Sequence, residues 1–379
     1  MLAHFTHHLV STLPTPLLPF IRDDFTLDYT QCGLLISAFK VSNGISQLPA
    51  GWLADRIGPR LLITLGTSGV ALAGLLVGLS PTYIMMVVFL ALMGMLGGGY
   101  HPASAPIVTA SVTPENQGRA LGLHMSAGSS PLWIAPLIAA ALAPIWGWRG
   151  TFVGLAIPAI MFGIILYIIL GRGLGTKKAE HNPISAHSEI RATRGNPYHL
   201  VSLIVLVAFT QAILFSTAAF IPLFLVDHFG VSREAAAASL AVIFSAGLWV
   251  SPLGGYLSDR LGKVSVILMG SLVAGPTVYL LNIVPYGLGI GAVLFTIGLV
   301  SYIRTAATEA YIVNHTSEHN RSTILGVYYF ATMGGGSIIS LLLGYFIDQL
   351  GFYTTFSIIS ATIVVITLGC SILLWGSRD

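Results

Sequence analysis

The stretch GWLADRIGPR at Gly51–Arg60 recurs 204 residues later as GYLSDRLGK at Gly255–Lys263. Each copy joins a small-residue helix end to a short charged loop, and a further apolar run follows at once. Glycine permits the tight reversal, the Asp can face a helix N-terminus, and the basic residues can face lipid phosphates. Two copies at one spacing, both between segments long enough to cross a bilayer, indicate a membrane protein built from an internal duplication.

The composition also predicts a membrane protein. Apolar residues make up 55% of the chain, charged residues make up 8%, and the mean hydropathy is +0.84. A soluble domain of 379 residues needs far more polar surface than this. Segments of about 20 residues bounded by charges, Pro or Gly predict twelve transmembrane helices. They are 2–21, 31–53, 61–79, 82–110, 119–142, 150–170, 199–226, 235–257, 264–282, 286–313, 322–347 and 352–375.

The basic residues predict the orientation. If both termini are cytoplasmic, twelve Lys and Arg residues fall in inner loops and three fall in outer loops. Because positive charge favours the cytoplasmic side, we expect a multi-pass protein of the inner (cytoplasmic) membrane with both termini inside. The inner set is Arg56, Arg60, Arg119, Arg172, Lys177, Lys178, Arg191, Arg194, Arg260, Lys263, Arg321 and Arg378, and the outer set is Arg22, Arg149 and Arg233.

The duplication divides the chain into three parts. We predict an N-terminal six-helix bundle over residues 1–171, a cytoplasmic linker over 172–197 and a C-terminal six-helix bundle over 198–379. The linker is the one stretch in which charged residues and histidines interrupt the apolar rhythm. The expected fold class is an all-α membrane protein of two pseudo-symmetric bundles.

Three charged residues fall well inside the predicted helices: Lys40, Arg304 and Glu309. Lys40 precedes Gly51 by eleven residues, which places it about 16 Å from the helix end and near mid-bilayer. An ionised side chain costs at least about 2.5–3.5 kcal/mol there, so each should face a water-filled cavity or a partner. We predict that Lys40 and Arg304 bind substrate, facing each other across a central cavity, and that Glu309 accepts protons. Alternatively, Lys40 could snorkel to an interface, and Arg304 and Glu309 could form a structural pair.

Histidines gather on the first and fourth predicted helices. His4, His7 and His8 share helix faces at spacings of three and four residues. His101 occupies nearly the same place in the first half as Arg304 in the second. A neutral imidazole costs less to bury than a fixed charge, and its unperturbed pKa of about 6.5 suits proton transfer. We predict proton coupling through His7 and His8 and substrate binding assisted by His101, while hydrogen-bonded packing is the plainer alternative for each histidine.

Four aromatic residues complete the predicted substrate site: Trp133, Trp249, Tyr302 and Tyr328. Aromatic rings can stack on a substrate, but packing between helices explains them at least as well.

The loop at Gly51–Arg60 resembles the signature Gly-x-Leu-x-Asp-Arg-x-Gly-x-Arg of the major facilitator superfamily, and the likeness covers the whole chain. The resemblance implies one substrate site between two six-helix halves that work by alternating access. It also implies gating at the cytoplasmic face by Asp55, Arg56, Asp259 and Arg260.

Within the superfamily, three stretches resemble the fosmidomycin-resistance-type branch: HFTHH at 4–8, QCGLL at 31–35 and YHP at 100–102. His8 stands where that branch usually has an acid, so a first-helix carboxylate is absent. The fifth helix has only fragments of the Gly-Pro motif of antiporters, at 128–131 and Pro136.

Other chemistry finds no support in the sequence. The chain has no Gly-x-x-x-x-Gly-Lys-Ser/Thr loop for nucleotide phosphates, no Cys-x-x-Cys and no His-Glu-x-x-His. We expect no cofactor and no metal, since no carboxylate or thiolate accompanies His4, His7 and His8.

The expected function is secondary transport of a small organic anion or zwitterion by a non-enzymatic monomer in a lipid bilayer, with protons as candidate coupling ions and no role in nucleic-acid binding. The alternatives are a proton-antiport pump for hydrophobic or cationic drugs and, from a different class, a non-transporting membrane receptor or enzyme.

Overall fold

The computed structural model describes residues 1–113, 116–173, 197–316 and 318–374, and every regular element in these ranges is a helix. The first half contains α1 (Leu2–Thr12), α2 (Leu18–Phe25), α3 (Tyr29–Ile57), α4 (Pro59–Thr64), the π-helix η1 (Leu65–Gly69), α5 (Val70–Gly78), α6 (Tyr83–Gly97), α7 (Tyr100–Ala110) and α8 (Gln117–Gly173). The second half contains α9 (Pro197–Phe229), α10 (Arg233–Leu261), α11 (Lys263–Leu280), α12 (Leu288–His315) and α13 (Glu318–Leu374).

The two longest helices each contain two membrane crossings. Gly147 of α8 has φ 69° and Gly351 of α13 has φ 74°, so each of the two helices reverses direction at a glycine, which tolerates a positive φ. If these helices are divided there, and the broken segments α1–α2, α4–α5 and α6–α7 are each taken as one crossing, the described residues form twelve segments. This confirms the predicted all-α fold. Eight helices of the described residues are long and apolar enough to cross a membrane as they stand.

The duplication is visible in the backbone. Gly147 and Gly351 lie 204 residues apart, and so do Gly58 and Gly262, which have φ values of 83° and 85°. The repeated loop of the sequence therefore has the same backbone shape in both halves, because the same glycine relieves the same left-handed turn.

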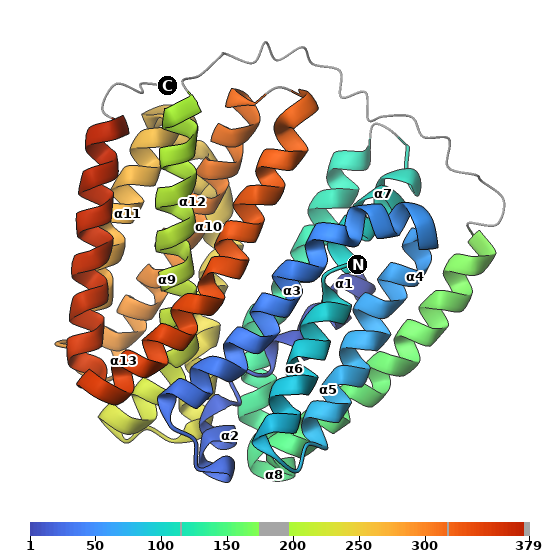
Figure 1. Cartoon of the computed structure of the whole chain (residues 1–379), viewed down its shortest axis with the longest axis horizontal. Coiled ribbons are helices and arrows are strands. Elements are labelled where there is room, and N and C mark those ends of the chain that lie inside the picture. The colour runs from blue at the N-terminus through green and yellow to red at the C-terminus, as the bar shows by residue number, and fades with distance from the viewer. Residues whose placement is uncertain (114–115, 174–196, 317, 375–379) are drawn as a thin grey trace.

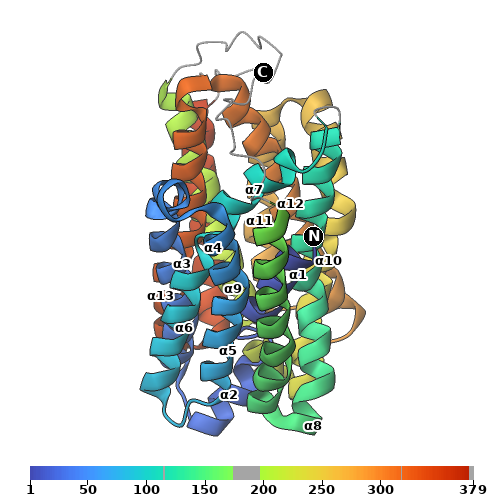
Figure 2. The same cartoon turned by 90° about the vertical axis from the view of Figure 1, so that its right-hand side faces the viewer.

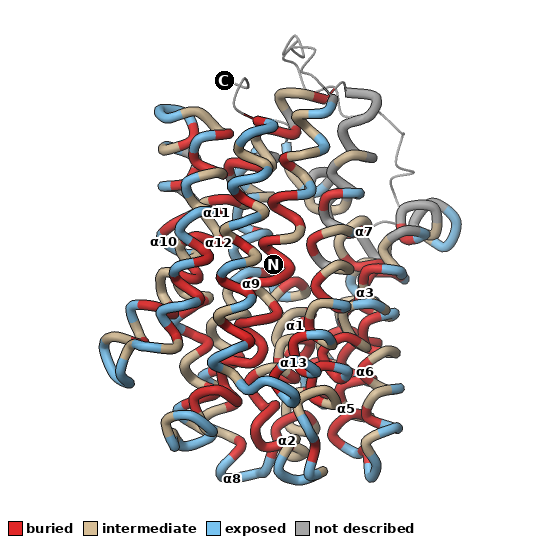
Figure 3. The backbone as a smooth tube through the Cα atoms, turned by 60° about the vertical axis from the view of Figure 1, so that its left-hand side comes forward, coloured by how far each residue is buried: buried red, intermediate tan, exposed pale blue. Residues whose placement is uncertain are grey.

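Figure 1 shows α1–α8 on one side of the molecule and α9–α13 on the other. The halves meet where α3 packs against α13 and α8 packs against α10. Figure 2 turns the first half toward the viewer, with α5, α6 and the two arms of α8 side by side. Buried residues follow the helix faces that meet neighbours (Figure 3), while large apolar side chains such as Leu72, Ile84 and Ile145 are exposed, as expected for a surface that contacts lipid.

Small residues bring α3 and α13 into close contact. A Cβ at Gly33 would lie 2.5 Å from Ser340 O, and one at Gly344 would collide with Tyr29 O. Ser37 Oγ also donates to Ser337 O at 2.5 Å. Only small side chains let two backbones approach this closely, so these positions fix how the two halves meet.

Candidate functional site

Ion pairs join the two halves at one end of the molecule, which we call the closed end and define by residues 22–30, 227–233 and 345–352. Arg22 donates to both oxygens of Asp227, with Nη2 2.9 Å from Oδ1. Arg233 Nη1 donates to Asp23 Oδ2 at 3.1 Å. Asp23 and Asp227 are 204 residues apart, so the repeat that revealed the duplication also relates these carboxylates. Sequence analysis did not single them out, although this spacing was available as a signal.

A carboxylate of the second half caps a helix of the first. Asp348 Oδ1 accepts from the backbone N–H of Tyr29 at 2.9 Å, and Oδ2 accepts from that of Thr30 at 2.8 Å. These N–H groups belong to the first turn of α3 and have no partner within the helix. The contact therefore stabilises α3 only while the halves are together at the closed end.

Lys40 lies on the face of α3 that is turned toward α13. Ser37 and Gly44, three residues before it and four after, share this face, and both contact α13: Ser37 bonds Ser337 O, and a Cβ at Gly44 would lie 3.5 Å from Gly334 Cα. Lys40 is partly buried. It has no hydrogen-bond or ion-pair partner among the residues that the structure describes.

Arg304 is fully buried inside the second half, with 0% of its surface exposed. Its Nη2 donates to Thr210 Oγ1 and lies 3.4 Å from Val207 O, both on α9. The stem of Arg304 lies against Gly270 of α11, where a Cβ would come 2.7 Å from Arg304 Cγ. Its Nε and Nη1 have no hydrogen-bond partner among the described residues.

In this state Arg304 does not face Lys40 across a cavity, because Arg304 points into its own bundle and the two make no contact within the described ranges. The repeat explains why. Tyr100, 204 residues earlier, is only 1% exposed, and a Cβ at Gly66 would meet its ring just as one at Gly270 would meet Arg304. This helix position faces inward in both halves, and the neighbouring position, His101, is the more exposed one.

The other predicted residues of the second half differ in their burial. Tyr328 is buried close to both Arg304 and Glu309, and Glu309 is partly buried and has interactions of its own. Tyr302 packs against α10, where a Cβ at Gly247 would lie 2.7 Å from its ring. Trp249 is 73% exposed on α10 and contributes nothing to a closed site in this state.

The histidines, in contrast, form one cluster, which we call the histidine cluster: His4, His7 and His8 of α1, His101 of α7 and His124 of α8. The ring centroid of His4 lies 4.3 Å from that of His124, 5.0 Å from that of His8 and 5.2 Å from that of His101. Tyr100 stacks on His7 at 4.7 Å. Sequence spacing predicted the contacts within α1. The contacts that His101 and His124 make with α1 depend on how α1, α7 and α8 pack together.

Hydrogen bonds fix two of these rings. His4 Nδ1 is 2.9 Å from the backbone oxygen of His124, and His7 Nδ1 is 2.6 Å from that of Gly66. A carbonyl oxygen only accepts, so each Nδ1 carries the proton. His4 and His7 are 2% and 3% exposed, whereas His8 and His101 are partly buried. Trp133, on the same helix as His124, has a buried indole N–H without a partner among the described residues.

The predicted gate residues lie at the opposite end from the closed end. Arg56, Asp259 and Arg260 are exposed, and Arg260 lies over the ring of Tyr256 at 4.8 Å. The side chain of Asp55 lies outside the described residues, as does most of the predicted linker.

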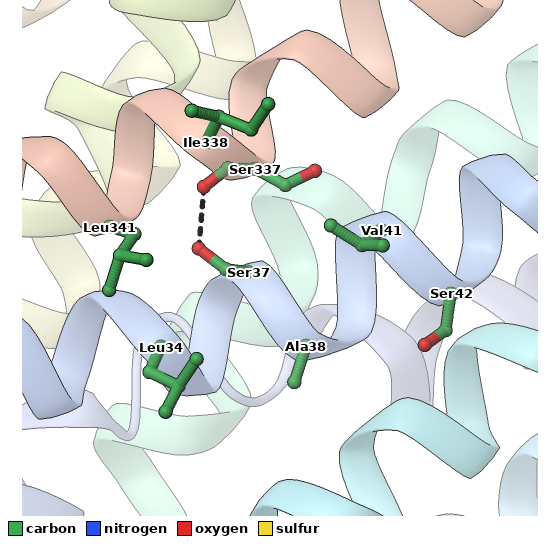
Figure 4. Close-up of a pocket in the computed structure, with 8 residues that line it drawn as sticks. All are labelled: Leu34, Ser37, Ala38, Val41, Ser42, Ser337, Ile338 and Leu341. Carbon is green, nitrogen blue, oxygen red and sulfur yellow. Dashed lines mark hydrogen bonds between the residues drawn. The ribbon is translucent and has the colours of Figure 1, made fainter.

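A pocket of about 290 Å³ lies between α3 and α13 (Figure 4). Its walls are apolar apart from serines, so it offers no charge to an ionic substrate, and Lys40 is not part of its lining. The lining residues are Leu34, Ser37, Ala38, Val41, Ser42, Ser337, Ile338 and Leu341.

Comparison with known proteins agrees with this architecture. A crystal structure of a bacterial homologue of the human lysosomal transporter Spinster, in an inward-facing and occupied conformation, superimposes with a TM-score of 0.80 at 18% identity, over 99% of this chain and 94% of that chain. At this identity the likeness shows the fold alone.

Two curated relatives are similar in sequence over most of their length. The hexuronate transporter of Bacillus subtilis (strain 168) is 25% identical over 356 residues, 89% of this chain and 83% of the relative. Multidrug resistance protein MdtG of Klebsiella pneumoniae (strain 342) is 27% identical over 291 residues, 76% of this chain and 70% of the relative.

A sequence profile of the Major Facilitator Superfamily matches residues 1–338 and, in a second overlapping match, 243–379. Together with the twelve helical segments in two related halves, this match shows that the chain belongs to the Major Facilitator Superfamily and is a membrane transporter rather than an enzyme.

Proposed function

We propose that this transporter moves a small organic anion or zwitterion. The observation that carries the proposal is the pair of cations within the membrane-spanning helices, Lys40 and Arg304, neither of which has a carboxylate partner among the described residues. A charge in the membrane interior is costly unless it is paired. An anionic substrate would supply the missing partner.

The chemistry of the two cations differs in a useful way. Arg304 retains unpartnered N–H donors at Nε and Nη1, which can donate charge-assisted hydrogen bonds to a carboxylate or phosphonate. Lys40 supplies a compact point charge from the other half. Arg304 is fully buried in this state, so we propose that it binds substrate in another state of the transport cycle. Lys40 and His101 are only partly buried in this state.

The two relatives support different substrates. The name of the hexuronate transporter specifies an organic anion, whereas MdtG is named a multidrug resistance protein. Export of hydrophobic or cationic drugs is therefore the second candidate. Two unpaired cations favour the anion, because they would repel a cationic drug.

We further propose an inner-membrane location, cytoplasmic termini and an inward-facing state. Arg22 and Arg233 belong to the closed end and Arg149 pairs there with Asp24, and by the positive-inside rule the end with these outer-loop arginines would face away from the cytoplasm. Asp55, Arg56, Asp259 and Arg260 would close the cytoplasmic side in the outward-facing state.

The finer assignments are proposals as well. The bundles would span 1–171 and 198–379 around the linker at 172–197, and the protein would act as a monomer of the fosmidomycin-resistance-type branch. Protons would be the coupling ions, with His7, His8 and Glu309 as carriers. Around His8 the titratable groups are His4 and His7 of α1, Tyr100 and His101 of α7 and His124 of α8.

Counterflow in proteoliposomes tests the substrate class. We expect accumulation of labelled glucuronate, a hexuronate, against an unlabelled internal pool, and none of tetraphenylphosphonium, a lipophilic cation. Lys40→Gln should raise KM about tenfold or more, since truncating one partner of a buried charge pair costs about 2–5 kcal/mol. Lys178→Gln, in the linker sequence, is the matched control. Counterflow of the cation and of no member of an organic-anion panel would contradict the proposal.

A further inference from the structure

The histidine cluster contains a potential set of metal ligands. One ring nitrogen from each of His4, His8 and His101 can be chosen so that all three lie within 4.8 Å of one another. A tetrahedral metal with bonds of about 2.0–2.1 Å needs its nitrogen ligands about 3.4 Å apart, so small side-chain rotations would close the set around an ion. Helices α1 and α7 supply these ligands, so the set is not contained in the histidine spacing of α1 alone.

The hydrogen bonding of His4 prepares it as a ligand. Its Nδ1–H donates to the backbone oxygen of His124 at 2.9 Å, which leaves the lone pair on Nε2. That Nε2 is buried and has no partner among the described residues, in a side chain that is only 2% exposed. Metal-binding histidines commonly donate their second nitrogen to a backbone carbonyl, which fixes the tautomer and the ring orientation.

Packing also fixes the position of the His4 ring. A Cβ at Gly128 of α8 would collide with the ring of His4, so glycine at 128 makes room for the imidazole. The rings of His8 and His101, 5.3 Å apart, have no hydrogen-bond partner within the described ranges. Hydrogen-bonded packing therefore explains His7, whose Nδ1 bonds Gly66 O, and Nδ1 of His4, but not Nε2 of His4 or the rings of His8 and His101.

We propose that His4, His8 and His101 form a three-histidine site for a divalent transition-metal ion of the Zn²⁺ type, with the fourth position open and with His8 binding the ion in place of a transported proton. Imidazole ligands suit Zn²⁺, Co²⁺, Ni²⁺ and Cu²⁺, and three protein ligands with one open position are typical of reactive rather than structural zinc sites. His8 and His101 are partly exposed, so the open position lies on their side of the cluster. Three neutral imidazoles leave the ion its full positive charge, which would attract an anionic oxygen.

Metal titration of the purified full-length protein tests the site. The protein carries a tag without histidines and is stripped with chelator, and Co²⁺ and Zn²⁺ are then added in turn. We expect one Co²⁺ per chain with the intense visible absorption of a tetrahedral complex, displaced by Zn²⁺. His8→Ala and His101→Ala should each weaken binding more than tenfold. His228→Ala, at the closed end where His228 stacks on Phe224, should leave it unchanged.

A fourth variant shows whether residue 8 is itself a ligand. His8→Cys should bind Co²⁺ and add a thiolate-to-metal charge-transfer band, which a merely structural role for His8 would not produce. Equal Co²⁺ affinity in the wild type, His8→Ala and His101→Ala, or no charge-transfer band in a folded His8→Cys protein, would overturn the proposal. Glucuronate counterflow in metal-free buffer is measured separately, so loss of the metal site and loss of the anion function are distinguishable.

Discussion

Position 100 of the first half and position 304 of the second show how one residue changes what the same place in a fold can do. Both side chains are buried against a glycine, Tyr100 against Gly66 and Arg304 against Gly270. Tyrosine there stacks on His7, and arginine there donates to Thr210. The duplication supplied equivalent places, and the difference in residue makes one a support for the histidine cluster and the other a buried cation.

Gly128 and Gly122, both on α8, give a matched test of the packing around His4. Gly128→Ala should displace the His4 ring, because the new Cβ would collide with it, and should destabilise the protein by about 1–3 kcal/mol. Gly122 has open space around it, so Gly122→Ala should be neutral or stabilising by up to about 1 kcal/mol. Thermal unfolding in detergent and Co²⁺ affinity measure both effects. Equal melting temperatures for the two variants would show that His4 is free to move.

Among the helices, α3 depends on the second half for its first turn. Asp348 of α13 accepts from the N–H groups of Tyr29 and Thr30, and Asp227 of α9 accepts from Arg22. Exposed ion pairs contribute at most about 1 kcal/mol each, and a helix cap contributes about 0.5–2 kcal/mol. The contacts at the closed end are therefore weak enough to be broken in each transport cycle.

We expect Asp227→Asn to open the closed end, shifting the equilibrium between the two states about fivefold for a loss of about 1 kcal/mol. Asp24→Asn is the control, because Asp24 pairs with Arg149 within the first half and does not join the halves. Spin labels at residues 26 and 286, both exposed near the closed end, report the distance by double electron–electron resonance. The same distance distribution in Asp227→Asn as in the wild type would show that Asp227 does not hold the two halves together.

Across the whole molecule, transport requires that events in one half affect the other. Histidines supply titratable groups in the first half and Glu309 supplies one in the second. If protons are the coupling ions, substrate-driven flux should change the external pH, with a rate that depends on pH because imidazole side chains take up and release protons. As pH rises the imidazoles lose their protons, so proton-coupled flux should fall.

The measurement is substrate-driven pH change in proteoliposomes. Glu309→Gln and the His7→Ala/His8→Ala double variant should lose it while retaining counterflow, since exchange of substrate for substrate needs no net proton movement. Wild-type transport without proton flux or pH dependence would mean that the protein works as a uniporter or anion exchanger, or with another ion.

The sequence by itself determined the class, the helices and the duplication. These properties are local: a bilayer requires about 20 apolar residues per crossing and internal hydrogen bonds for every backbone group, and both can be recognised along the chain. The 204-residue offset predicted the paired loops, and Gly58 with Gly262 confirms it in backbone angles. The same offset relates Asp23 to Asp227, the two carboxylates that bind arginines between the halves.

Only the tertiary structure decided which residues meet. Depth in the membrane follows from counting residues, but the direction of a side chain depends on how its helix is rotated, and packing against neighbours sets that rotation. Gly270 leaves room for the stem of Arg304 inside the second bundle. Gly128 leaves room for the ring of His4 beside His124 and His101. These contacts join residues on different helices, and the spacing within one helix carries no information about them.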